Sequence, residues 1–291
     1  MGGVFHNLPG GLFDIQGDTA LGSNAPTALI INEGIVRKTA GNSTAGCWPR
    51  LINNGVVEIS SGRLSCAGGF SNPTGTISLA GGTLQNNQPI NLTGGLLTRW
   101  GSLNATVTNS ATVYPSPTNG VLTINGNYVQ TLAGITAFEL GGNVPAINQS
   151  RLNIVGATDL SGCINVEWAS GYLPEPGTNF AVMTFVSRVG EFDCHNGFLL
   201  LGQGRRLTPV YAPTSLTLST IAAPEPTEIP LSVTVKSSSA LVAWPLEFTG
   251  YELYWSTNLG LSSWTLISGA TNRWFESPPL AREKYFRLQE P

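Results

Sequence analysis

A glycine recurs about every twenty residues in the first third of the chain, and each one precedes a short stretch in which apolar and polar residues alternate. Successive glycines lie 21, 20 and 20 residues apart: Gly34, Gly55, Gly75 and Gly95. Asparagines precede them at similar steps: Asn32, Asn53, Asn72 and Asn91. A period of this length, with one strand signature per unit, is typical of solenoids, in which each unit buries its apolar face against its neighbours.

An Asn-Gly pair ahead of alternating residues, as in LINNGVVEISSGRL (residues 51–64), also predicts a β-hairpin. A hairpin explains one such pair but not four glycines in step, so we interpret the pair as a corner between stacked strands. Asparagine and glycine tolerate the left-handed backbone of such a corner, and stacked asparagines can pair their side-chain amides. Lys38 is the exception, because it falls where Ile59 lies in the next unit. We expect that its strand bends before it or that the register shifts there.

The composition supports a chain of short strands. Only 11% of the 291 residues are charged, against roughly 25% in an ordinary globular domain. Glycine and proline interrupt every window that could form an amphipathic helix, which predicts an all-β fold. A net charge of −3 provides no basic face for nucleic acid, and no apolar run is long enough for a membrane span. No signal peptide is visible at the start, so we expect an internal piece of a larger secreted protein.

Two cysteine pairs are expected to form disulfides. Cys47 and Cys66 lie 19 residues apart, about one unit. Equivalent residues of neighbouring units are then one strand spacing apart, roughly 4.8 Å, which lies inside the Cα separation of about 4.4–6.8 Å that a disulfide allows. Cys163 and Cys194 form the second expected pair. Four free buried thiols remain the alternative, whereas bridged cysteines would indicate an extracytoplasmic protein.

The C-terminal fifth of the chain changes in character. Residues 221–228 belong to a proline-rich stretch, STIAAPEPTEIP, which predicts an extended linker after a first domain of residues 1–220. Residues 229–291 hold four of the seven tryptophans and several short alternating segments. We expect a small β-sandwich there.

Both parts resemble known families. The segments FHNLPGGLFDIQGD, NNGVVEISSGRLSCAGG and RLNIVGATDLSGCINVEWASGYLPEPGTNFAVMTF resemble repeats of bacterial secreted β-helix proteins of the autotransporter-passenger and adhesin type. The segments VAWP, GYELYWSTNL, SSWTLI and KYFRL resemble a fibronectin-type-III-like sandwich. The resemblance implies a right-handed parallel β-helix followed by a small β-sandwich, in a surface or secreted protein that usually has no catalytic activity.

Catalytic and metal-binding residues are not expected. Enzymes built on β-helices need converging carboxylates, and residues 1–135 contain only four acids, no two of which share a position in the repeat one period apart: Asp14, Asp18, Glu33 and Glu58. Asp193, Cys194 and His195 are adjacent, but neighbours in a strand face opposite ways. They therefore make a poor metal site and a poor thiol–base pair. We expect no catalytic, cofactor-binding or metal-binding residue, and no enzyme.

Aromatic residues are the candidate ligand contacts. In YELYWSTN the side chains alternate, so an inward Leu253 implies an inward Trp255 and an outward Tyr254, while a slip of one residue exposes Trp255. With Trp274 or Phe275 the exposed ring could stack on a sugar; packed rim aromatics are the alternative. Trp244 and Trp264 are expected in the core of the sandwich.

The sequence thus predicts a non-catalytic extracellular or cell-surface structural or adhesion protein, with a rod-like stalk that presents a binding surface. Its expected partners are glycans or cell-surface molecules, and further copies of itself stacked head to tail into a filament. The alternative is a carbohydrate-binding or polysaccharide-degrading β-helix protein. No cofactor, nucleic acid or membrane span is expected.

Overall fold

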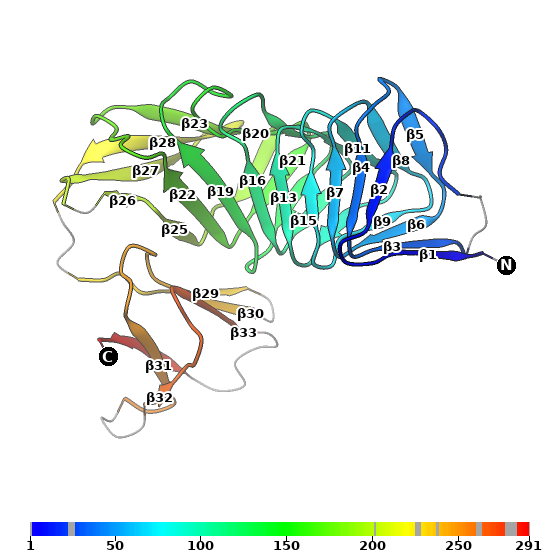
Figure 1. Ribbon diagram of the computed structural model, residues 1–291. Coiled ribbons are helices and arrows are strands. Elements are labelled where there is room, and N and C mark those ends of the chain that lie inside the picture. The colour runs from blue at the N-terminus through cyan, green and yellow to red at the C-terminus, as the bar shows by residue number, and fades with distance from the viewer. Residues whose placement is uncertain are drawn as a thin grey trace.

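The computed structural model describes residues 2–22, 27–200, 202–224, 228–236, 239–259, 264–276 and 284–290. These residues form strands, turns and irregular segments, and none of them lies in a helix. The all-β prediction is therefore confirmed for this part of the chain. Long parallel sheets extend along the molecule from the N-terminal end, and shorter antiparallel sheets lie beside their far end (Figure 1).

Three sets of strands make up the long sheets. The β2–β25 sheet has nine, in the order β2 (Leu12–Ile15), β4 (Ile35–Lys38), β7 (Val56–Ile59), β10 (Thr76–Ser78), β13 (Leu96–Arg99), β16 (Thr112–Pro115), β19 (Ile135–Leu140), β22 (Cys163–Trp168) and β25 (Cys194–Asn196). The β5–β26 sheet has ten, in the order β5 (Thr44–Cys47), β8 (Arg63–Cys66), β11 (Thr83–Asn86), β14 (Gly101–Asn104), β17 (Leu122–Ile124), β20 (Leu152–Ile154), β23 (Asn179–Thr184), β28 (Ser215–Ala222), β27 (Arg205–Tyr211) and β26 (Leu199–Leu200). The third set, the β1–β24 sheets, contains β1 (Val4–Asn7), β3 (Leu29–Asn32), β6 (Arg50–Asn53) and β9 (Phe70–Ser71), then β12 (Ile90–Leu92), β15 (Val107–Asn109), β18 (Tyr128–Gln130), β21 (Ala157–Leu160) and β24 (Ser187–Gly190).

The chain visits the three sets in turn and returns to each about one period later. Val57 of β7, for example, pairs in parallel with Val36 of β4 and with Ile77 of β10. Only the last strands of the β5–β26 sheet, β26 to β28, pair antiparallel. The period seen in the sequence therefore corresponds to one visit to each set of strands.

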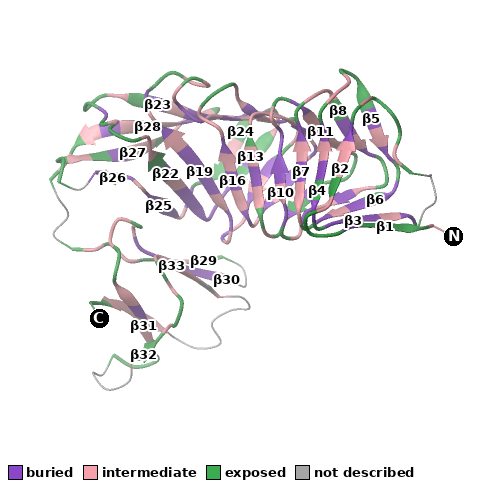
Figure 2. Cartoon of the chain, viewed as in Figure 1, coloured by how far each residue is buried: buried purple, intermediate pink, exposed green. Residues whose placement is uncertain are grey.

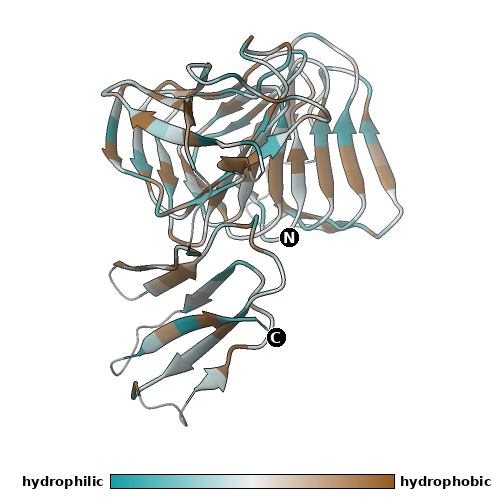
Figure 3. Cartoon of the chain, turned by 90° about the vertical axis from the view of Figure 1, so that its left-hand side faces the viewer, coloured by the Kyte–Doolittle hydropathy of each residue, from teal (hydrophilic) through white to brown (hydrophobic). Residues whose placement is uncertain are grey.

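Register explains the core. Val36, Val57, Ile77, Leu97 and Val113 are aligned across successive strands of the β2–β25 sheet and are all buried. Their sequence neighbours point to the other face because side chains alternate along a strand. Buried and exposed positions consequently form rows across the sheets (Figure 2), and apolar stretches of neighbouring strands line up when the molecule is viewed from the β26–β28 end (Figure 3).

The periodic glycines are needed for close backbone approach. A Cβ on Gly55 would overlap the carbonyl oxygen of Gly34, and one on Gly95 would overlap that of Gly75. Of the four glycines in step, only Gly95 has a positive φ, 76°. The left-handed corner expected from the sequence is therefore wrong for the other three, where the spacing between stacked backbones imposes glycine.

Buried asparagines form a ladder along the β1–β24 sheets. Asn7 Nδ2 donates to Asn32 Oδ1 at 2.8 Å, Asn32 Nδ2 to Asn53 Oδ1 at 2.8 Å, and Asn53 Nδ2 to Asn72 Oδ1 at 2.7 Å. The predicted stacking is confirmed for Asn32, Asn53 and Asn72, and the structure adds Asn7 to the ladder. Asn91 was wrongly placed on the ladder: it is exposed, and its neighbour Leu92 pairs with Asn72 and with Asn109 instead.

Lys38 keeps the register of its neighbours. It pairs with Ile15 and Ile59 and is completely buried among them. Its Nζ donates to Asp18 Oδ1 at 2.9 Å and to three carbonyl oxygens, those of Gly17, Ala40 and Gly41. The expected bend or register shift is therefore wrong, because the ammonium group replaces its lost hydration with one carboxylate and main-chain acceptors.

Cys47 and Cys66 lie where the period places them, but they are not bridged. They are Cα partners in β5 and β8, both are buried, and both are free thiols. The Cys47 thiol donates to the carbonyl oxygen of Pro49 at 3.4 Å. The predicted Cys47–Cys66 disulfide is therefore not formed in this structure, although the two thiols are hydrogen-bonded to each other across the adjacent strands.

The C-terminal residues form two three-stranded antiparallel sheets. One contains β29 (Ser232–Lys236), β30 (Ser239–Ala243) and β33 (Arg273–Glu276), and the other contains β32 (Thr265–Leu266), β31 (Glu252–Ser256) and β34 (Tyr285–Gln289). Val242, Trp244 and Leu253 form their shared core. The expected boundary at residue 220 falls inside β28, which continues to Ala222; residues 225–227 of the expected linker lie outside the described residues.

Candidate functional site

A disulfide lies where the long sheets meet the C-terminal sheets. Cys163 of β22 and Cys194 of β25 are Cα partners in adjacent parallel strands, 4.6 Å apart, and their sulfurs are bonded. This predicted bridge is confirmed. Ile164 belongs to the main core, so Cys163 faces the other side of the sheet, where Leu241 and Ala243 of β30 cover it.

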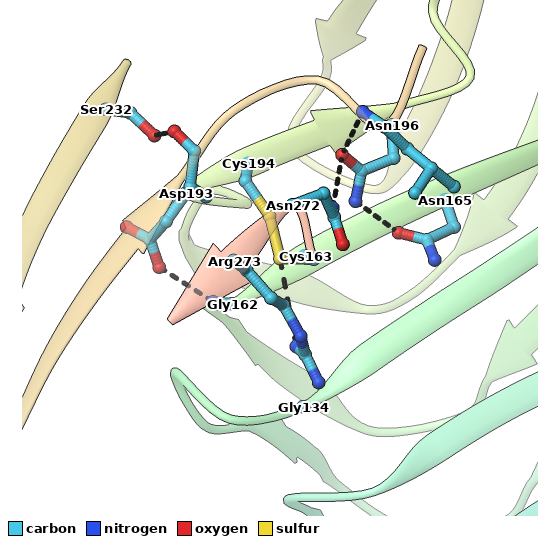
Figure 4. Close-up of a disulfide and its surroundings, with 12 residues drawn as sticks. Gly134, Gly162, Cys163, Asn165, Asp193, Cys194, Asn196, Ser232, Asn272 and Arg273 are labelled. Atoms are coloured by element: carbon cyan, nitrogen blue, oxygen red, sulfur yellow. Dashed lines mark hydrogen bonds between the residues drawn. A yellow bond between two sulfur atoms is a disulfide. The ribbon is translucent and has the colours of Figure 1, made fainter. Parts of the chain in front are cut away.

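Polar contacts surround this apolar patch (Figure 4). Asp193 Oδ2 accepts hydrogen bonds from the Gly162 amide at 2.7 Å and from Ser161 Oγ at 2.8 Å, and it forms an ion pair with Lys236 of β29 at 3.2 Å. Lys236 Nζ also donates to Ser161 Oγ at 2.9 Å. These contacts attach the first strand of the C-terminal sheets to the end of the long sheets.

A second group of contacts comes from β33 and the residue before it. Arg273 Nη1 donates to the Ala133 carbonyl oxygen at 3.3 Å, and burial lowers the pKa of this guanidinium. Asn196 Nδ2 donates to Asn165 Oδ1 at 2.8 Å, while Asn196 Oδ1 accepts from Asn272 Nδ2 at 3.3 Å. The disulfide therefore lies at the centre of an interface rather than on a free surface.

The side chains of Asp193, Cys194 and His195 have different partners and do not converge, in agreement with the alternation of side chains along a strand. Cys194 is bridged, Asp193 binds main-chain and lysine donors, and His195 stands in register with Ile164, with its ring 5.0 Å from that of Phe198. Burial lowers the pKa of His195. Among the residues that the structure describes, no group of three or more histidine, cysteine, aspartate or glutamate side chains is arranged to hold a metal ion.

A cavity of about 360 Å³ opens beside this interface. Residues of the last long-sheet strands form one wall and residues near β29 and β30 form the other: His195, Phe198, Leu199, Arg206, Leu207 and Pro209, facing Pro230, Ser232, Trp244 and Pro245. Two of the lining residues, His195 and Trp244, each have a ring nitrogen without a hydrogen-bond partner, but both atoms are buried rather than exposed to the cavity. Sequence patterns could not indicate this cavity, because its two walls come from separate segments, residues 195–209 and 230–245, that share no repeat.

The candidate aromatic residues do not form one surface. Trp255 pairs with Phe286 and Leu253 with Leu288, and Leu253 is buried, so Tyr254 lies on the opposite face, as predicted for an inward Leu253. Lys284 Nζ covers the Trp255 and Trp274 rings, at 4.8 and 5.4 Å from their centroids, and forms an ion pair with Glu276. Trp274 also packs against the core. The side chain of Phe275 lies outside the described residues.

A different cluster stands on the outer face. The Arg287 guanidinium lies 5.6 Å from the centroid of the Tyr254 ring and 4.5 Å from that of Trp264. Tyr254 Oη donates to Glu252 Oε2 at 2.7 Å, and this hydrogen bond raises the pKa of Tyr254. Trp244 is buried in the core as predicted, whereas Trp264 is half-buried against Arg287, so its expected core position is wrong. The alternation of apolar and polar residues in the sequence could not reveal that Lys284 covers Trp255 and Trp274, or that Arg287 packs against Tyr254 and Trp264.

The fold and the interface define the class of protein only coarsely: an all-β chain with long parallel sheets, two antiparallel C-terminal sheets and a disulfide where they meet. Comparisons with protein-family models and with curated proteins find no match for the chain. No described segment forms a helix long and apolar enough to cross a membrane.

Proposed function

We propose that the chain is a non-catalytic extracellular or cell-surface protein, in which a right-handed parallel β-helix forms a stalk and a fibronectin-type-III-like sandwich presents a binding surface. The observation that supports this most is the register of the β2–β25 sheet, which pairs nine strands in parallel without interruption. The Cys163–Cys194 disulfide is consistent with an extracellular location.

The binding surface that we assign to this protein is the cluster of Tyr254, Trp264 and Arg287. Aromatic faces stack on the apolar side of sugar rings, and the guanidinium of arginine supplies a fixed fork of donors for hydroxyl or carboxylate oxygens. Trp255 and Trp274 are less suited to this role because Lys284 covers both rings. Of the expected aromatic contacts, this proposal keeps Tyr254 on the outer face of β31 and replaces Trp274 and Phe275 with Trp264 and Arg287.

The test is a glycan array probed with the full chain and with two variants, Tyr254→Ala and Arg287→Gln. Binding to a set of glycans that both variants lose is the expected result. Tyr251→Phe is the matched control, because Tyr251 contacts Glu290 and no ring or cation of the cluster. Arrays that stay blank, or variants that bind as the unchanged protein does, would contradict glycan binding by this face.

A second candidate function rests on two carboxylates. Tyr114 Oη lies 2.8 Å from Glu167 Oε2 and 3.2 Å from Glu139 Oε2, and these glutamates are Cα partners in β19 and β22. The two accepting oxygens are therefore at most 6.0 Å apart, the sum of the two distances, compared with about 5–5.5 Å between the carboxyl groups of retaining glycoside hydrolases. The sequence-based search missed the pair because it stopped at residue 135.

Release of reducing sugar from a panel of plant and bacterial polysaccharides tests this alternative. A polysaccharide-degrading protein should lose that activity in Glu139→Gln and in Glu167→Gln, while Glu58→Gln on the same sheet retains it. Absence of product from the unchanged chain on every polysaccharide would remove the hydrolytic alternative.

A further inference from the structure

Four asparagines of the chain are followed directly by glycine: Asn54, Asn119, Asn125 and Asn196. Such a pair can cyclise, because glycine carries no side chain that shields its main-chain nitrogen from the amide carbon of the preceding asparagine. Ring closure requires that this nitrogen be free of hydrogen bonds and that the main chain rotate. The structure therefore decides which of the four pairs reacts.

The main chain around Asn54 is fixed by the stacked strands. The main-chain nitrogens of Asn54 and Gly55 donate to the Asn32 carbonyl oxygen at 2.8 and 2.9 Å. Gly55 also packs so closely against Gly34 that a Cβ would overlap its carbonyl oxygen. The Gly55 nitrogen reaches the Asn54 amide carbon only after these contacts open, and such openings are rare within paired strands.

Asn125 and Asn196 are held through their side chains. Asn125 Nδ2 donates to Asn104 Oδ1 at 2.6 Å, and the main-chain nitrogen of Asn125 donates to the Leu103 carbonyl oxygen at 2.8 Å. Asn196 is only 2% exposed, and both its Nδ2 and its Oδ1 are hydrogen-bonded at the interface with the C-terminal sheets. Neither amide carbon is free to turn towards the glycine that follows it.

Asn119 differs because it lies in the connection between β16 and β17. Within the described part of the chain, neither the main-chain nitrogen of Asn119 nor that of Gly120 donates a hydrogen bond. The Asn119 side chain is exposed, and its Nδ2 donates to the neighbouring Thr118 Oγ1 at 3.2 Å. Its φ is positive, 69°, which is uncommon for a residue other than glycine. Both reacting groups are therefore accessible, and no ladder of hydrogen bonds fixes the main chain between them.

We propose that Asn119 is a site of spontaneous deamidation in the folded protein. The Gly120 nitrogen attacks Cγ of Asn119, and Nδ2 leaves as ammonia with the proton that the glycine nitrogen gives up through solvent. The product is a five-membered succinimide ring. Water then adds its hydroxyl to either ring carbonyl and its remaining proton to the ring nitrogen, which gives aspartate or isoaspartate with a carboxyl group that is ionised at neutral pH. This site does not depend on glycan binding.

The modification has a structural consequence at Trp100. A Cβ on Gly120 would lie 3.0 Å from Cε3 of Trp100, and one on Gly81 would overlap the same ring, so both glycines pack on the indole. Isoaspartate routes the main chain through its own Cβ and so lengthens the connection by one carbon. Gly120 is then displaced from the indole, whereas aspartate leaves the main chain as it is.

The test is to incubate the full chain in mildly alkaline buffer and to map its peptides by mass spectrometry at intervals. Conversion of Asn119 is expected to be at least about tenfold faster than that of the other three asparagines, the ratio given by a barrier difference of about 1.4 kcal/mol. The same chain in denaturant is the control, because unfolding removes every contact that distinguishes the four pairs. All four rates should become similar there.

The displacement at Trp100 is tested on the purified isoaspartate form, labelled with ¹⁵N. Its indole N–H signal for Trp100 should shift, whereas that of Trp168 should not, because Trp168 Nε1 donates to the Gly197 carbonyl oxygen at 2.9 Å. The variant Asn119→Gln should show neither the conversion nor the shift. Equal rates at the four pairs of the folded chain, or conversion of Asn119 only in denaturant, would overturn the site. An unmoved Trp100 signal in the isoaspartate form would overturn the displacement.

Discussion

At the scale of single residues, buried polar side chains determine how precisely one strand lies over the next. Asn32 and Asn53 each accept from the ladder asparagine on one side and donate to the one on the other, so a displaced strand would leave amides unpaired in the core. The spacing of asparagines predicted Asn32, Asn53 and Asn72 correctly. It failed at Asn91 because the unit there is one residue longer than expected, which brings Leu92 onto the ladder.

Replacing Asn53 with alanine should reduce stability substantially. The change removes the acceptor for Asn32 Nδ2 and the donor to Asn72 Oδ1, and it also removes a hydrogen bond to the Thr76 carbonyl oxygen. We expect the free energy of unfolding to fall by about 2–4 kcal/mol, measured by denaturant unfolding. Asn91→Ala, on an exposed side chain, should change it by less than about 0.5 kcal/mol. Equal effects of the two variants would show that the ladder adds nothing to stability.

Lys38 and Asp18 should respond unequally to substitution. Asp18→Ala leaves the ammonium group of Lys38 buried without its carboxylate, whereas Lys38→Met fills the same space and leaves Asp18 partly in water. We therefore expect a larger decrease in Tm for Asp18→Ala than for Lys38→Met, measured by differential scanning calorimetry. The reverse order would indicate that Lys38 is not held in the core as an ion.

At the scale of strands, in-register parallel pairing accounts for most of the fold, and the spacing of the glycines in the sequence predicted its period. The sequence did not show why glycine is required at these positions. Gly55 approaches Gly34, one unit away, and only the stacked backbones reveal that contact. The antiparallel strands β26 to β28 could not be anticipated from the period, since the repeat has ended before they begin.

Acid should loosen the first strands of the β2–β25 sheet. The hydrogen bond from Arg37 lowers the pKa of Asp14 to about 2, and the hydrogen bond from Lys38 lowers that of Asp18. Because both pKa values are lower in the folded state, their contribution is complete above about pH 4 and is lost as the pH falls towards 2. Hydrogen exchange of β2 and β4 should accelerate in this interval.

The variant Asp14→Asn with Asp18→Asn is the control for the acid response. It should exchange faster than the unchanged chain at neutral pH and show less additional acceleration on acidification. A steep response that persists without the two carboxylates would assign it to other groups.

The cysteines divide into one bridge and two thiols. Titration of the denatured, unreduced chain should therefore find two reactive thiols, and peptide mapping should assign them to Cys47 and Cys66. Cys163→Ser should lower the free energy of unfolding by about 3.5–4 kcal/mol, because the bridge closes a loop of about thirty residues. Four thiols, or none, would contradict this pairing.

At the scale of the whole molecule, the two ends of the long sheets differ. Val4, Phe5 and Leu12 are exposed at the N-terminal edge, whereas Phe192 and Phe198 are buried at the other end, beside the C-terminal sheets (Figure 1). The sequence could predict two parts of different composition. It could not predict how they dock, because the docking contacts between Lys236 and Asp193 or between Arg273 and Ala133 follow no local pattern.

This asymmetry bears on self-association. Val189 on β24, the last strand of its sheet, is also exposed, but the exposed apolar side chains of β1 and β2 are more closely grouped, so we expect this chain to pair through its N-terminal edges as a closed two-fold dimer. Sedimentation velocity should show monomers and dimers at rising concentration, and Phe5→Lys should leave only monomers. Long rods under the electron microscope would instead support the filament expected from the sequence.

The position of the Cys163–Cys194 bridge beneath Leu241 and Ala243 has a kinetic consequence. A reducing agent cannot touch sulfur atoms that are almost completely buried, so the C-terminal sheets must lift before the bond can be cleaved. The rate of reduction therefore reports how often the C-terminal sheets lift away from β22 and β25.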